Sequence, residues 1–202
     1  MAIKGIIFDM EGVLMKTGEK DLSACWAKAL NAPYDAVHAV FYGEMNDLAD
    51  LGTVSQDDFD RYLITTLGLG MDKLPIIQKV INEECFIDSI LVQKILELKK
   101  DFKIALLTNY TQMMRDKIEN EWNIKHLFDE IIISFEVGLI KPDPAIFDLT
   151  LSRMGLSASE AVLVDDRIKN IEGARQYGMH AILYETREQA LQDLDRLIES
   201  EI

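Results

Sequence analysis

The sequence has little positive charge and no long apolar run. Its 202 residues include 21 lysines and arginines against 35 aspartates and glutamates, so the formal net charge at pH 7 is −14. Proteins that bind nucleic acid or an anionic membrane surface need a surplus of basic side chains, and we therefore expect neither partner. No apolar stretch approaches the roughly 20 residues that a membrane-spanning helix needs.

Cysteine is scarce as well. Cys25 and Cys85 are the only two, and they form neither a disulfide framework nor a metal-ligand spacing. The apolar stretch Gly5–Phe8 is too short for a signal peptide and runs directly into Asp9. These features predict a cytoplasmic protein with ordinary reduced thiols.

The apolar residues that are present follow two patterns. Residues 3–8 form a short apolar run that predicts a buried strand, and residues 19–86 are helical in pattern throughout. Beyond residue 88, predicted helices alternate with four short apolar runs, which are Ile104–Leu107, Ile131–Ile133, Ala161–Val164 and Ala181–Leu183. Capping residues mark three helix starts independently of the apolar period: Ser55 with Asp58, Asp143 with Pro144, and Thr186 with Gln189.

Alternating strands and helices predict an α/β fold, a Rossmann-like parallel sheet with helices on both faces. The helical stretch between the first strand and the others is then an insertion that forms a cap. We expect a core of residues 1–16 and 88–202 and a helical cap of residues 17–87. The segments near residues 15–19 and 87–89 join the two parts, and we expect them to act as hinges.

Polar residues follow these strands at the edge where ligands of parallel sheets bind. They are Asp9 and Glu11 after the first strand, Thr108 and Asn109 after the second, Lys141 in the loop beyond the third, and Asp165 and Asp166 after the fourth. Each alone has an ordinary explanation as a turn, cap or surface residue. Together they favour a site, and three neighbouring carboxylates with oxygen-only ligands favour Mg²⁺ as its cofactor.

Four pieces of the sequence carry a family resemblance: IIFDMEGVL, LLTNY, KPDPAIF and VLVDDRIKNIEGARQYGM. They resemble the four motifs of the haloacid-dehalogenase-like hydrolase superfamily, in the branch with a helical cap between the first two motifs. The fourth piece is similar to sugar-phosphatase-like members and to the phosphatase domain of soluble epoxide hydrolase. The resemblance implies a sheet with the first strand at its centre and a Mg²⁺-dependent phosphatase that acts through an aspartyl-phosphate.

The resemblance also implies roles for individual residues. Asp9 would be the nucleophile, and the metal would be held by Asp9, by the backbone carbonyl of Glu11 and by Asp166. Lys141 would neutralise charge on Asp9 and on the phosphoryl group.

The remaining site residues would bind phosphate or support the metal ligands. Thr108 would donate its hydroxyl to the phosphate beside the backbone N–H of Asn109, and Asp165 would act through water. Asn170 lies four residues after Asp166, on the same face of a helix, and we expect it to hold Lys141 or Asp166.

Glu11 is a departure from the family pattern, which usually has aspartate two residues after the nucleophile. That residue protonates the leaving oxygen and then activates water, and glutamate keeps the acid–base group one methylene further out. The sequence therefore leaves open a working phosphatase, a slow or phosphotransferase-like enzyme, and a non-catalytic binding or regulatory protein. A 2-haloacid dehalogenase, which needs neither Mg²⁺ nor a leaving-group acid, is disfavoured by Glu11 and by the Asp165–Asp166 pair.

A helical cap over the site would hinder a protein substrate, so we expect a small phosphorylated metabolite. The residues that could face the site from the cap are Trp26, Tyr34, His38, Phe41, Tyr42 and Met45.

Overall fold

A five-stranded parallel sheet forms the centre of the protein. The structure, a computed structural model, describes residues 2–200, apart from the side chain of Gln78. The strand order is β5-β4-β1-β6-β7. The strands are β1 (Gly5–Phe8), β4 (Lys103–Thr108), β5 (Glu130–Ile133), β6 (Ala161–Asp165) and β7 (His180–Leu183). The first strand is central, as expected, because β1 pairs in parallel with both β4 and β6.

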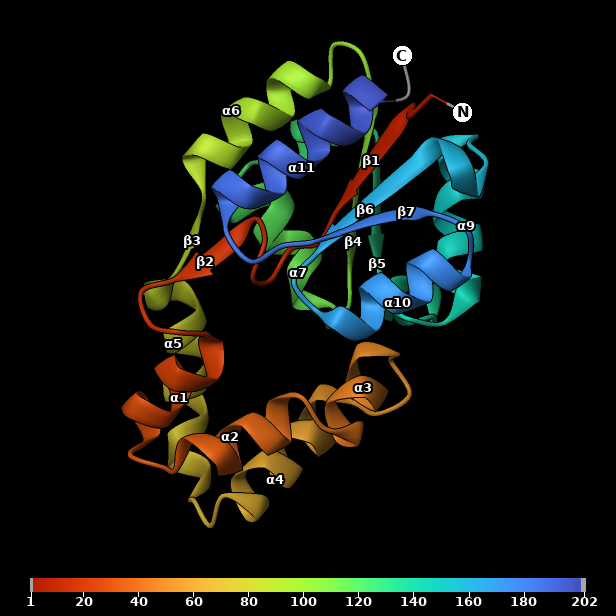
Figure 1. The fold of residues 1–202 in the computed structure, drawn as a ribbon. Helices are drawn as coiled ribbons and strands as arrows, with labels where there is room; N and C mark the ends of the chain where they lie inside the picture. The colour runs from red at the N-terminus through yellow and green to blue at the C-terminus, as the bar shows by residue number, and fades with distance from the viewer. Residues whose placement is uncertain (1, 201–202) are drawn as a thin grey trace.

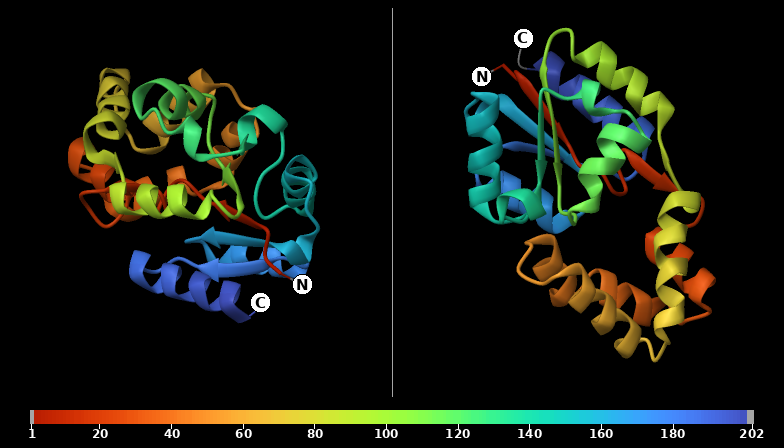
Figure 2. Two further views of the ribbon diagram at one scale, coloured as in Figure 1. Left: turned by 90° about the horizontal axis from the view of Figure 1, so that it is seen from above. Right: turned by 180° about the vertical axis from the view of Figure 1, so that it is seen from behind.

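The helices form layers on both faces of this sheet (Figures 1 and 2). Ile6 and Phe8 of β1 belong to one buried cluster with α6 (Ser89–Leu98) and α11 (Arg187–Ser200). Ile7 belongs to a second buried cluster with α9 (Pro144–Met154) and α10 (Ile168–Gln176). Successive side chains of a strand point to opposite faces, so a central strand with helices on both sides is apolar throughout. The predicted α/β fold is confirmed.

The predicted helix starts are also present. The Asp143 side chain accepts a hydrogen bond from Ala145 N at 2.8 Å, ahead of α9. The Thr186 hydroxyl accepts one from Gln189 N at 3.2 Å, at the start of α11. Short elements complete this part of the chain: α7 (Met113–Asp116), a π-helical turn (Lys117–Glu121), α8 (Ser134–Val137), and 3-10 turns at Lys125–Leu127 and Ala158–Glu160.

The segment between the first two strands of the sheet is mainly helical. It contains α1 (Leu22–Leu30), α2 (Tyr34–Phe41), α3 (Glu44–Asp50), α4 (Gln56–Thr66), a 3-10 turn (Met71–Lys73) and α5 (Leu74–Glu84). In Figure 1 these helices lie below the sheet, beside the ends of its strands. We call α1–α5 the helical segment. Its behaviour as a separate cap stays a prediction.

An antiparallel ribbon connects the helical segment to the sheet, and the sequence did not predict it. Strand β2 (Met15–Thr17) pairs with β3 (Cys85–Ile87), with Met15 opposite Ile87. Directly beside this pair, Asp88 N donates a hydrogen bond to Leu14 O at 3.0 Å. The chain therefore leaves the sheet and returns to it at one place. Within residues 2–200, no helix has the length and apolarity to cross a membrane.

Candidate active site

The predicted site residues meet at the carboxyl ends of the strands, around an inner cavity between the sheet and the helical segment. All of them line this cavity except Asp165, which is fully buried beside it. The lining residues are Asp9, Glu11, Tyr42, Thr108, Asn109, Lys141, Asp166, Arg167 and Asn170. Tyr42 follows α2, so the helical segment contributes directly to the cavity.

Lys141 is the positive centre of the site. Its ammonium group donates to Asp9 Oδ1 at 2.8 Å, to Asp165 Oδ2 at 2.7 Å and to the backbone carbonyl of Leu107 at 2.8 Å. An ammonium group has three donors, so these partners use all of them and fix its position. Burial alone would lower the pKa of Lys141, but the carboxylates of Asp165 and Asp9 raise it above its ordinary value. Lys141 is therefore charged at neutral pH.

Asp165 is held by donors on all sides. Besides Lys141, it accepts hydrogen bonds from Arg167 N at 2.9 Å and from Asn170 Nδ2, which is 3.0 Å from both carboxylate oxygens. Asn170 thus contacts Asp165, and not Lys141 or Asp166 as the helix spacing suggested. The reason is that Asp165 ends β6 and points beneath the first turn of α10, where Asn170 faces it.

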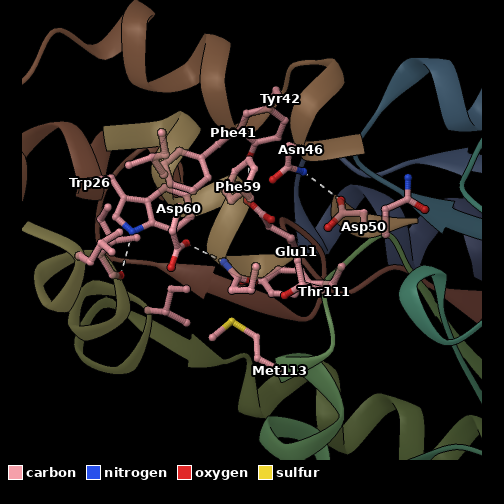
Figure 3. A pocket seen from close by; sticks show the side chains of 17 residues that line it. Glu11, Trp26, Phe41, Tyr42, Asn46, Asp50, Phe59, Asp60, Thr111 and Met113 are labelled. Carbon is pink, nitrogen blue, oxygen red and sulfur yellow. Dashed lines mark hydrogen bonds between the residues drawn. The ribbon is translucent and has the colours of Figure 1, made fainter. Parts of the chain in front are cut away.

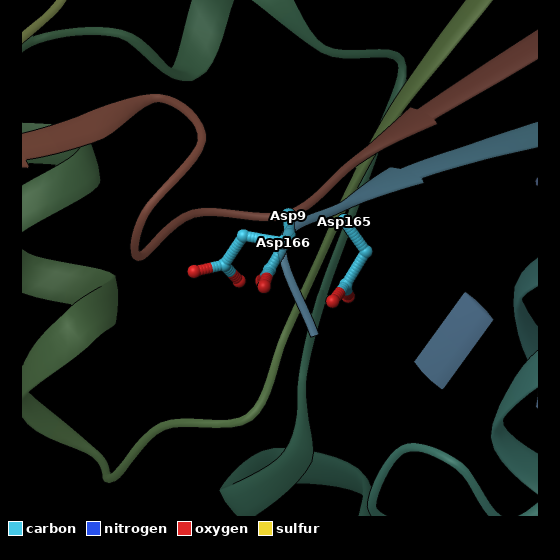
Figure 4. Close-up of side chains that lie close together, drawn as sticks. All are labelled: Asp9, Asp165 and Asp166. Carbon is cyan, nitrogen blue, oxygen red and sulfur yellow. The ribbon is translucent and has the colours of Figure 1, made fainter. Parts of the chain in front are cut away.

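Three carboxylates, Asp9, Asp165 and Asp166, lie together at this point (Figure 4). An oxygen atom of each lies within 4.8 Å of the others. Burial raises the pKa of Asp9 well above its ordinary value, with Lys141 opposing the change. Burial, Asp165 and Glu11 raise the pKa of Asp166 to about 6. Burial is the largest cause of both shifts and the neighbouring carboxylates add to it, so a further cation would favour the ionised form of the cluster.

Two other observations fit a metal ion at this cluster. Asn170 Oδ1 is buried and has no hydrogen-bond partner in the described part of the chain. This oxygen is suited to accept a hydrogen bond from metal-bound water, because Mg²⁺ usually keeps several waters. Gly12 has φ +78°, and a Cβ atom there would lie 2.0 Å from Asp166 Oδ2. Only glycine allows Asp166 to approach the loop after β1 this closely.

Thr108 ends β4, the strand next to β1, and Asn109 follows it directly. Thr108 is buried and lines the inner cavity. The Asn109 side chain forms two hydrogen bonds with the backbone of Lys141, donating to its carbonyl at 3.0 Å and accepting from its N–H at 2.9 Å. The side chain of Asn109 therefore anchors the loop that carries Lys141.

Glu11 connects the sheet to the helical segment. Its Oε1 accepts a hydrogen bond from the Tyr42 hydroxyl at 2.5 Å. The Arg167 guanidinium lies 5.1 Å from the centre of the Tyr42 ring. Burial raises the pKa of Glu11, while the Tyr42 hydrogen bond and Arg167 oppose the change. The Glu11 side chain is thus long enough to reach a specific partner, the Tyr42 hydroxyl.

A second, outer cavity adjoins the inner one and lies between the helical segment and the core (Figure 3). The two cavities share Glu11, Tyr42 and Asn109. About 110 Å³ of the outer cavity is open to the centres of water molecules. Of the predicted facing residues, Trp26, Phe41 and Tyr42 line this cavity, whereas Tyr34, His38 and Met45 do not.

Several cavity residues were not predicted. Asp50, Asp60 and Asn46 line the outer cavity and Arg167 lines the inner one. Burial, together with Glu11 and Asp47, raises the pKa of Asp50 to about 8. Arg167 follows Asp166 directly, so its place at the end of β6 was a usable signal. The helical segment carries no motif that marks Asp50 or Asp60.

Comparison with known proteins places these motifs in a family. Residues 3–178 match the sequence model for haloacid dehalogenase-like hydrolases. Glyceraldehyde 3-phosphate phosphatase of Methanocaldococcus jannaschii is 30% identical over 190 residues, covering 88% of this chain and 82% of that protein. Phosphoserine phosphatase of Thermus thermophilus is 36% identical over 86 residues, covering 42% of this chain. Some matches cover only part of the relative. This chain spans 34% of the Thermus phosphatase and 10% of mouse acyl-CoA dehydrogenase family member 10.

Solved structures share the fold. A predicted HAD-like family hydrolase from Porphyromonas gingivalis has a TM-score of 0.78 at 21% identity, over 98% of both chains. A HAD family enzyme from Bacteroides thetaiotaomicron, in complex with magnesium and inorganic phosphate, has a TM-score of 0.70 at 19% identity, over 90% of this chain and 93% of that one. A 2-haloacid dehalogenase from Pseudomonas syringae has a TM-score of 0.65 at 20% identity, over 98% and 99%.

Proposed function

Because the chain belongs to the haloacid dehalogenase-like hydrolase family, we propose that it is a Mg²⁺-dependent phosphatase acting on a small phosphorylated metabolite. The observation that carries the proposal is the arrangement of Asp9, Lys141 and the Asp165–Asp166 pair around one cavity. A phosphatase relative that matches most of the chain adds support.

Asp9 is the nucleophile in this proposal. Lys141 and the backbone N–H of Met10 both donate to its Oδ1, at 2.8 and 2.7 Å. Its Oδ2 has no hydrogen-bond donor among the described groups and remains available for attack. The Oδ2–P bond forms while the bond from phosphorus to the leaving oxygen breaks, and the product is an aspartyl-phosphate.

Glu11 is the acid–base group. In its protonated form it gives its proton to the leaving oxygen, so that the alcohol departs neutral. The resulting carboxylate then takes a proton from water, whose oxygen attacks phosphorus and releases Asp9 and inorganic phosphate. Burial supports the first role, since it raises the pKa of Glu11 and favours the protonated form.

The other cavity residues stabilise charge. Asp9, Asp166 and the backbone carbonyl of Glu11 would hold Mg²⁺, which supplies positive charge against the nucleophile and the phosphoryl oxygens. Lys141 supplies a second positive charge. The Thr108 hydroxyl and the Asn109 N–H bind phosphoryl oxygens, and Asn170 positions Asp165, which in turn holds Lys141.

We also propose that residues 17–87 form a cap over the site and that the remaining residues form the core. The Glu11–Tyr42 hydrogen bond supports a closed arrangement in which the helical segment excludes water from the inner cavity. The hinges would lie on either side of the β2–β3 ribbon.

The experiment that tests the proposal is release of phosphate from p-nitrophenyl phosphate with Mg²⁺, and in excess chelator. Activity should vanish on chelation and return with Mg²⁺. Asp166→Asn should remove it, whereas Glu172→Gln, a matched change at an exposed position on α10, should not.

Two results would contradict the proposal. Full activity in excess chelator would exclude a required metal ion, and dechlorination of 2-chloropropionate without phosphate release would identify a dehalogenase. The fold is shared with dehalogenases, so the assay decides this point.

A further inference from the structure

The outer cavity is lined by acidic side chains and by no basic one. The acids are Glu11, Asp50 and Asp60, and no lysine, arginine or histidine is among the residues that line it. None of these three carboxylates takes part in an ion pair within the described part of the chain. A second anionic group on the substrate would therefore meet like charge in a partly enclosed space.

Each of the two aspartates from the helical segment accepts a side-chain hydrogen bond at one of its carboxylate oxygens. Asn46 Nδ2 donates to Asp50 Oδ2 at 2.9 Å, and Gln56 Nε2 donates to Asp60 Oδ1 at 2.8 Å. The other oxygen of each carboxylate has no hydrogen-bond donor among the side chains and backbone groups that the structure describes. Asp50 is only 6% exposed, and a carboxylate this buried is destabilising unless it gains a partner.

Aromatic rings also line the cavity. Trp26 and Phe41 are stacked with ring centres 3.6 Å apart, and Phe59 meets Phe41 edge-on at 6.0 Å. The face of an aromatic ring attracts organic cations, most strongly when the cation is removed from water. Carboxylates and aromatic faces around one cavity both favour a positively charged organic ligand.

We propose that the alcohol released by this phosphatase is an organic cation, so that the substrate is a phosphate monoester of an amino alcohol with an apolar body. The phosphoryl group lies in the inner cavity, and the ammonium group lies in the outer cavity against Asp50 and Asp60. The inference rests on the proposed phosphatase function. The open space of about 110 Å³ is of the same order as the roughly 150 Å³ of a cavity that takes up benzene, so the apolar body is about the size of one ring.

Four matched esters test this inference on the full-length protein with Mg²⁺. They are phenyl phosphates with a para aminomethyl, hydroxymethyl, ethyl or carboxymethyl group. The methylene separates each substituent from the ring, so the leaving oxygens are similar while the charge at the far end differs. Assays at pH 8.5 keep Asp50 largely ionised, because burial raises its pKa to about 8.

The aminomethyl ester should have a kcat/KM about 10-fold above that of the ethyl ester, and the carboxymethyl ester about 10-fold below it. Asp50→Asn and Asp60→Asn should each lower the aminomethyl-to-ethyl ratio by about 3-fold or more. Asp47→Asn and Asp57→Asn remove the same charge from the same two helices, at positions that do not line the cavity, and should leave the ratio unchanged. Because the readout is a ratio, a partial loss of folded protein does not affect it.

Distinct outcomes separate failure of this inference from failure of the proposed function. Equal hydrolysis of all four esters would overturn the cation inference alone, as would equal preference for the hydroxymethyl and aminomethyl esters. An unchanged ratio in both Asp50→Asn and Asp60→Asn would also overturn it. Failure to hydrolyse any of the four, or p-nitrophenyl phosphate, would overturn the phosphatase function itself.

Discussion

Shortening Glu11 to aspartate should lower turnover, although it restores the residue type usual in the family. In the structure, Glu11 Oε1 lies 2.5 Å from the Tyr42 hydroxyl. An aspartate carboxylate would be withdrawn by one carbon–carbon bond, about 1.5 Å, and would lose this contact. Tyr42, whose hydroxyl contacts Glu11, belongs to the helical segment. Shortening residue 11 would therefore leave its carboxylate out of reach of that hydroxyl.

The size of the effect follows from two limits. Removing a general acid–base group costs about 10²- to 10⁴-fold in rate, and this range applies to Glu11→Ala. A misplacement of about 1 Å can cost on the order of 10²-fold while the group is retained. We therefore expect Glu11→Asp to lower kcat by about 10- to 100-fold, and less for p-nitrophenyl phosphate than for an alkyl phosphate, because p-nitrophenol needs little protonation.

Steady-state kinetics on Glu11→Asp, Tyr42→Phe and the double variant measure this dependence. Tyr42→Phe keeps the ring beside Arg167 and removes only the hydroxyl that contacts Glu11. If the contact positions Glu11, Tyr42→Phe should lower kcat in the wild-type background and have little further effect once Glu11 is shortened.

Either of two results would refute the reasoning. One is a kcat for Glu11→Asp at or above the wild-type value. The other is independent effects, in which the two substitutions multiply. Indifference of turnover to both Glu11→Ala and Glu11→Asp would remove Glu11 from the mechanism.

Three further predictions concern the carboxylates. Asp9→Asn should abolish turnover and leave the protein folded, and beryllium fluoride should raise the melting temperature of the wild type only; hydrolysis by this variant would exclude Asp9 as nucleophile. Mg²⁺ should raise the melting temperature of the wild type but not of Asp166→Asn, as measured by thermal unfolding; an equal rise in both would remove Asp166 from the metal site. Asp50→Asn should raise the free energy of unfolding. Burial raises the pKa of Asp50 to about 8 in the folded protein, so between about pH 4 and pH 8 this carboxyl ionises in the unfolded chain but not in the folded one, and the wild type loses stability. The advantage of the variant should therefore grow over that range. A gain in unfolding free energy that does not change with pH would contradict this.

Most of the sheet was predictable because buried parallel strands are continuous apolar runs. The run at residues 104–107, for example, lies within β4. The β2–β3 ribbon was not predictable, since each strand has three residues and mixed polarity, and its pairing joins positions about 70 residues apart. Such pairing depends on the tertiary structure and leaves no local pattern.

The candidate site was likewise only partly predictable from the sequence. The residues at strand ends could be predicted, because the topology of a parallel sheet brings those positions together. The partner of Asn170 could not, because helix spacing gives the face of a residue but not which of two adjacent carboxylates it reaches. The contact between Glu11 and Tyr42 joins two parts of the chain that only the folded structure brings together.

The hydrogen bond between Asp88 and Leu14 has a consequence for how this protein could change over evolutionary time. Since the two ends of the intervening segment are adjacent, that segment could be lengthened, shortened or exchanged with one from another gene without altering the register of the five central strands. The hydrolytic machinery, apart from Tyr42, would be inherited intact through such recombination. New substrates would then arise by replacing one continuous stretch of coding sequence, provided that each replacement keeps contacts to the core such as those of Tyr42 with Glu11 and of Asn82 with Lys117.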